Sequence, residues 1–120
     1  MRFHYLKTLY TNDWSERKIK RIKKKLRAQK TMFSLYLITI PEKNTGQLEI
    51  YNSLFFKQPI LQDIIEDVNV VGFASSYGEA LELVKTIVDE VIDKTGGLDI
   101  RSYIKELNDD VSIPLIEMIK

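Results

Sequence analysis

Two short, almost wholly apolar stretches constrain the fold of this chain more than any other feature. They are FSLYLITI, residues 33–40, and VNVVGFA, residues 68–74. Strands that are buried on both faces of a sheet have such near-continuous apolar sequences. Both stretches are far shorter than the roughly 20 residues that a membrane-spanning helix needs. We therefore expect a sheet that is covered on both sides, and no membrane-spanning segment.

Helical signals lie between and after these two stretches. Ser15 is suited to cap the N-terminus of one helix, and Ser76 with Glu79 forms an S-x-x-E capping box for a longer one. Gly96 is expected to end the longer helix in a left-handed conformation, and Asp99 to cap a short last helix through Leu107. Each helix is thus predicted from its end signals as well as from its apolar spacing.

The remaining segments complete the predicted order of elements. Residues 2–10, rich in aromatic and large apolar side chains, predict a strand, residues 48–55 a short helix and residues 60–66 a helical turn. Strands that alternate with helices favour a parallel sheet with right-handed crossovers. We therefore expect a single α/β domain over residues 1–120, with about three mainly parallel strands and a short C-terminal helix.

The segment RKIKRIKKKLRAQK, residues 17–30, carries most of the functional signal. Nine of its fourteen residues are Lys or Arg and none is acidic, and Ile19, Ile22 and Leu26 form one narrow apolar stripe on the predicted helix. Like charges four residues apart should cost this helix about 1–2 kcal/mol in total. A partner that neutralises them would therefore stabilise it. The candidate partner-binding residues are Arg17, Lys20, Arg21, Lys23, Lys24, Lys25, Arg27 and Lys30.

The two halves of the chain carry opposite charge, which leaves three interpretations of the basic helix. Residues 1–60 hold 13 basic and 4 acidic side chains, whereas residues 61–120 hold 5 basic and 13 acidic ones. The leading interpretation is a small cytoplasmic binding domain, in which the helix contacts an acidic partner protein or a second copy in a homo-oligomer. The alternative is binding of nucleic acid or another polyanion. The third is neutralisation within the chain by the acidic residues Glu82, Asp89, Glu90 and Asp93.

A second, less specific candidate for an anion site is the turn that contains Ser75 and Ser76. It joins the end of the second apolar stretch to a helix N-terminus, where anions bind in many α/β proteins. The sequence there matches neither a P-loop nor G-x-G-x-x-G, and Glu79 would repel an anion.

No catalytic, metal or cofactor site is predicted, and we do not expect an enzyme. The chain has no cysteine and one histidine, His4, which as a lone histidine in a strand is more typical of packing than of catalysis. The neighbouring acids Glu66 and Asp67 lack the spacing of a calcium loop and are interpreted as solvated loop residues. The first ten residues do not have the pattern of a secretory signal, which favours a cytoplasmic location.

The segment VVGFASSYGEALELVKTIVDEVIDKTGGLDIRSY, residues 70–103, resembles small uncharacterised bacterial proteins. The shared pattern is a strand that ends in Val-Gly, a helix around Glu-Ala-Leu-Glu-Leu-Val, and then Thr-Gly-Gly-x-Asp-x-Arg. That family has no assigned activity, so the resemblance implies none here.

Overall fold

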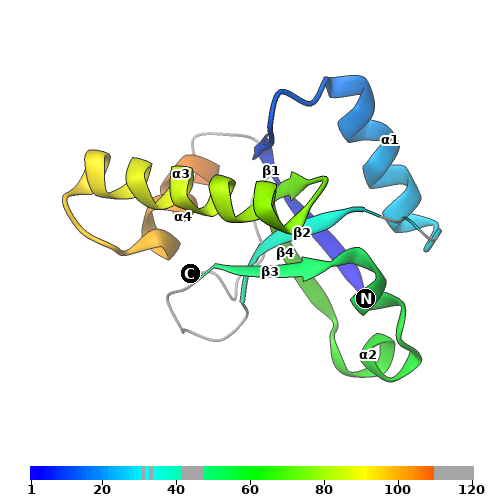
Figure 1. The fold of residues 1–120 in the computed structure, drawn as a ribbon. Coiled ribbons are helices and arrows are strands. Elements are labelled where there is room, and N and C mark those ends of the chain that lie inside the picture. The colour runs from blue at the N-terminus through cyan, green and yellow to red at the C-terminus, as the bar shows by residue number, and fades with distance from the viewer. Residues whose placement is uncertain (31, 33, 42–47, 110–120) are drawn as a thin grey trace.

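Four strands form one mixed sheet in the order β1-β4-β2-β3 (Figure 1). The computed structural model describes residues 1–30, 32, 34–41 and 48–109. The strands are β1 (Arg2–Tyr10), β2 (Tyr36–Ile40), β3 (Glu49–Asn52) and β4 (Asp67–Ala74). β1 is parallel to β4, whereas β2 is antiparallel to both of its neighbours, β4 and β3.

The prediction of an α/β fold is confirmed, but the prediction of mainly parallel strands is wrong. The prediction of a helix over residues 48–55 is also wrong. The first half of this segment is the strand β3, and the second half lies in the 3-10 helix η1 (Ser53–Lys57). The Asn52 side chain begins η1 by accepting a hydrogen bond from the Leu54 N–H at 3.0 Å. β3 forms a hairpin with β2, so a pair of strands that neighbour each other in sequence runs antiparallel.

The other elements begin and end close to where their signals stand. The α-helices in the described residues are α1 (Glu16–Arg27), α2 (Pro59–Ile64), α3 (Tyr77–Thr95) and α4 (Ile100–Asp109). The Ser15 hydroxyl accepts a hydrogen bond from the Lys18 N–H, and the Ser76 hydroxyl accepts one from the Glu79 N–H, both at 3.1 Å. The expected strand over residues 33–40 begins at Tyr36, and Phe33 lies outside the described residues.

β4 is the central strand of the core, and helices cover both of its faces. Phe73 is fully buried, and its ring is stacked by Trp14, which directly precedes the cap of α1, at 5.9 Å between centroids. Adjacent residues of a strand point to opposite faces. The next residue, Ala74, is paired with Tyr36, whose ring packs against Tyr77 of α3. α1 and α3 therefore lie on opposite faces of the sheet (Figure 1).

The apolar stripe of α1 packs on the sheet. Ile22 and Leu26 are buried, and Ile19 packs against the core at its edge.

Within the described part of the chain, no helix combines the length and the apolar character needed to cross a membrane.

Candidate functional site

The solvent-facing surface of α1 is basic along the length of the helix. A helix turns about 100° per residue. The residues on the side opposite the apolar stripe are all exposed, and we call them the outer basic stripe. They are Arg17, Lys20, Arg21 and Lys24. The helix thus presents one apolar side to the sheet and a cationic side to solvent.

No side chain of α1 forms an ion pair with another described residue. The ion pairs among these residues join Arg2 and His4 to Asp67. Of the four acids that might have neutralised α1, Glu90 instead accepts hydrogen bonds from Tyr10 and Tyr103, at 2.6 and 2.5 Å. All four lie on α3, which covers the other face of the sheet. These four acids therefore do not neutralise α1 by direct contact.

Two lysines on the flanks of α1 lie over aromatic rings. The Lys18 Nζ is 3.9 Å from the centre of the Trp14 ring, and the Lys23 Nζ is 4.8 Å from the centre of the Tyr5 ring. Both distances are within the range of a cation–π interaction. Burial, and secondarily the charge of Lys20, lower the pKa of Lys23. Lys23 thus carries its charge where water solvates it incompletely.

A pocket of about 460 Å³ opens beside the C-terminal half of α1, between β1, η1 and α2. Its volume is in the range of small-molecule sites, roughly 300–1,000 Å³. Five Lys or Arg side chains line it, and none of its described lining residues is acidic. The lining consists of Met1, Arg2, Phe3, His4, Tyr5, Lys23, Leu26, Arg27, Gln29, Lys30, Met32, Ser53, Phe56, Lys57 and Gln62.

The inner wall of this pocket is apolar. Phe3 packs edge-on against Phe56 at 5.8 Å between ring centroids, and Met32 and Leu26 are buried beside the core. Ser53 donates a hydrogen bond to the Met32 carbonyl at 3.1 Å, so this hydroxyl already has a partner. The pocket therefore combines a cationic rim with an apolar interior.

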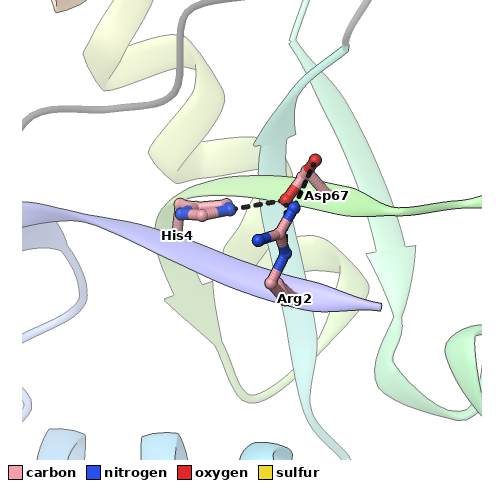
Figure 2. Close-up of polar contacts among 3 residues, drawn as sticks. All are labelled: Arg2, His4 and Asp67. Carbon is pink, nitrogen blue, oxygen red and sulfur yellow. Dashed lines mark hydrogen bonds and ion pairs between the residues drawn. The ribbon is translucent and has the colours of Figure 1, made fainter.

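A cluster of Arg2, His4 and Asp67 joins the beginnings of β1 and β4 (Figure 2). His4 Nε2 lies 2.8 Å and Arg2 Nε 3.1 Å from Asp67 Oδ1. The hydrogen bond with His4, and then the charges of Arg2 and His4, hold the pKa of Asp67 below its usual range despite its burial. Sequence reasoning placed Asp67 in a solvated loop, but it is the first residue of β4 and its side chain is only 10% exposed. No hydroxyl or thiol among the described residues hydrogen-bonds to His4, so the cluster does not point to nucleophilic catalysis.

The turn at Ser75 and Ser76 is occupied by a carboxylate of the chain itself. Glu79 accepts hydrogen bonds from the Ser75 N–H at 3.2 Å and from the Ser75 hydroxyl at 2.8 Å. The Ser76 hydroxyl caps α3. The Ser75 donors are thus engaged, and the Glu79 carboxylate adds a negative charge at the turn, so this turn supports no proposal of an anion site.

The structure divides the predicted basic residues between two surfaces. Lys23, Arg27 and Lys30 line the pocket, whereas the outer basic stripe and the half-buried Lys25 do not. Two aromatic residues of the pocket, Phe3 and Phe56, come from segments far from α1 in sequence, and the sequence alone did not link them to the basic segment. No cluster of three or more potential metal ligands occurs in the described residues.

Comparison with protein-family models gives no match. Neither a curated protein nor a solved structure matches the chain. The resemblance of residues 70–103 to small bacterial proteins therefore stays a prediction.

Proposed function

We propose that this chain is a binding domain and that the outer basic stripe of α1 contacts an acidic protein surface, on a partner or on a second copy. The observation that supports this most directly is the absence of any ion pair between α1 and the other described residues. The like-charge pairs Arg17/Arg21 and Lys20/Lys24 each cost about 0.2–0.5 kcal/mol. An acidic surface would relieve this repulsion.

A second copy has a surface that complements α1. On α3, Leu81 and Ile92 are 47% and 45% exposed, and the neighbouring Glu82, Asp89 and Asp93 are exposed acids. An apolar centre with a charged rim is the usual composition of a protein interface. Because α1 and α3 lie on opposite faces of one sheet, these surfaces can meet between two molecules but not within one.

Size-exclusion chromatography with light scattering tests this proposal. At about 0.05 M salt we expect a mass above that of the 14.0 kDa chain, and a decrease toward one chain at about 0.5 M salt, where surface charges are screened. An R21E/K24E variant should not associate at either salt concentration. K7E/K94E changes the net charge equally at exposed positions outside α1 and is the matched control.

Two results together would overturn the proposal. The first is a monomer at every salt and protein concentration, and the second is a pull-down in which wild-type chain recovers no acidic protein beyond those that R21E/K24E also recovers. Association that K7E/K94E abolishes equally would overturn it as well, because the effect would then belong to net charge and not to α1.

Nucleic acid is the second candidate, and the exposed cations along α1 favour it. Lys and Arg side chains that neutralise backbone phosphates supply most of the affinity of non-specific nucleic-acid binding. If the helix neutralises five phosphates, the logarithm of the affinity for duplex DNA should fall against the logarithm of salt with a slope of about −4 to −5. No change in fluorescence anisotropy of labelled DNA or RNA at low salt would end this candidate.

A further inference from the structure

We propose that the pocket beside the C-terminal half of α1 binds a small phosphorylated molecule with an apolar body. This ligand site is separate from the protein-binding surface proposed above, because no residue of the outer basic stripe lines the pocket. The two activities can therefore be removed independently.

Three cations on one flank of α1 define the rim. Lys23, Arg27 and Lys30 follow one another at spacings of four and three residues, and all three line the pocket. The rim also includes Arg2, whose charge is offset by Asp67. A phosphate offers up to two negative charges and three acceptor oxygens, which suits one guanidinium and two ammonium groups better than a single carboxylate does.

The end of a helix normally repels anions, because its last carbonyls carry partial negative charge. At α1 three of these carbonyls are bonded to backbone N–H groups of the following turn. The Lys24, Lys25 and Leu26 carbonyls accept from Ala28, Lys30 and Gln29, at 3.0 to 3.1 Å. What this end presents to the pocket is therefore side-chain cations. The incomplete solvation of Lys23 adds to this, since a bound anion would compensate for it.

The apolar interior indicates that the ligand is more than a free phosphate. Phe3, Phe56 and Met32 supply an apolar wall, and a volume of about 460 Å³ exceeds what one phosphate group fills. A ring or an acyl chain attached to the phosphate would cover this wall, because burial of apolar surface is favourable. A nucleotide and an alkyl phosphate both have this shared chemistry.

Titration calorimetry with two probes, adenosine 5′-monophosphate and decyl phosphate, tests the proposal and distinguishes the two sources. We expect at least one of them to bind with a stoichiometry of one per chain, and at least tenfold more tightly than inorganic phosphate, adenosine or decanol. No measurable binding of either probe would overturn the proposal. Equal affinity for inorganic phosphate would also overturn it, because the apolar wall would then contribute nothing.

Variants of α1 locate the binding. R27Q should lower the affinity for the bound probe about tenfold, the usual effect of losing a charge-assisted hydrogen bond. R21Q should change this affinity less than twofold. Both positions are exposed arginines on the same helix, but only Arg27 lines the pocket. Equal weakening by both variants would indicate general charge attraction and would overturn the site. R21E/K24E should lose protein association while retaining the probe, which separates failure of one proposal from failure of the other.

Discussion

Gly72 is the residue at which the sheet leaves no room for a side chain. β1 pairs with β4 up to Tyr5 opposite Val70, and pairs again only at Tyr10, opposite Gly72. A Cβ atom on Gly72 would lie 2.6 Å from the Tyr10 carbonyl oxygen and 3.3 Å from the Ile38 Cδ1. The first of these distances is one that real Cβ atoms do not adopt, and it involves backbone that cannot rotate away.

We expect Gly72→Ala to lower the free energy of unfolding by about 1–3 kcal/mol, the usual cost of overpacking. Urea unfolding followed by circular dichroism measures it. Gly78→Ala is the control. Gly78 lies in the first turn of α3, and a Cβ atom there would have no neighbouring atom within 4 Å. That change should leave stability unchanged or raise it by up to about 1 kcal/mol. Similar losses from both substitutions would contradict the close contact at Gly72.

Asp67 should give the protein a pH-dependent contribution to stability. Its pKa in the folded chain is lowered from the usual 3.8, first by the hydrogen bond with His4. A group with a lowered folded pKa stabilises the fold above the unfolded value, and this contribution is lost as the pH falls through the folded value.

We therefore expect Asp67→Asn to reduce the free energy of unfolding by about 1 kcal/mol at neutral pH and by clearly less near pH 3. Urea unfolding at the two pH values measures the difference. Asp63→Asn removes an exposed carboxylate of α2 and should change little at either pH. An equal loss at both pH values for Asp67→Asn would show that the carboxylate charge is not what stabilises the fold.

At the scale of elements, α1 and α3 are each followed by a residue in the left-handed conformation, but the residue type and the hydrogen bonds differ. α3 is followed by Gly96 at φ 75°, whereas α1 is followed two residues later by Gln29 at φ 55°. The N–H groups of Gln29 and Lys30 bond back to the Leu26 and Lys25 carbonyls, which is the Schellman pattern. Glycine adopts this left-handed conformation without steric cost, but glutamine does not.

Replacing Gln29 by Gly should therefore raise the free energy of unfolding by about 0.5–1 kcal/mol. Thermal and urea unfolding both report it. Gln29→Ala retains a Cβ and serves as the control, which should show no gain. A loss of stability in the glycine variant would mean that the glutamine side chain contributes contacts larger than the backbone strain.

End signals predicted the helices well, but apolar spacing misplaced one strand. Ser15, Ser76 and Gly96 act through hydrogen bonds and backbone angles within a few residues, so their effect can be predicted locally. Residues 48–55 fit helical spacing over too few residues to exclude a strand. Their state is decided by pairing with β2, where Leu37 lies opposite Tyr51. That pairing is not encoded within the segment itself.

For the molecule as a whole, the sequence predicted the class of fold but not the direction of its strands. The burial of β2 and β4 on both faces followed from their composition alone. Their antiparallel pairing did not, because two buried strands look alike in either direction. In the order β1-β4-β2-β3, the neighbours β1 and β4 are far apart in the sequence, so no local pattern encodes their pairing.

The candidate sites divide in the same manner. The basic surface of α1 was evident from one continuous segment. The pocket was not, because it combines Arg27 with Phe3 and Phe56, which are brought together only by the packing of β1 and η1 beside α1. Similarly, Glu90 was expected to be available for ion pairing, but two tyrosine hydroxyls from β1 and α4 bind it.

The irregular edge of β1 has a consequence for aggregation. β1 is an edge strand. Its residues 5 and 10 pair with residues of β4 that are only two positions apart, so residues 6–9 of β1 bulge out between them. A bowed edge with an exposed lysine, Lys7, is a poor template for a strand from another molecule. The opposite edge, β3, has only four residues. Neither edge therefore offers a long, regular template for fibril-like stacking of this domain, although its central strand is so apolar.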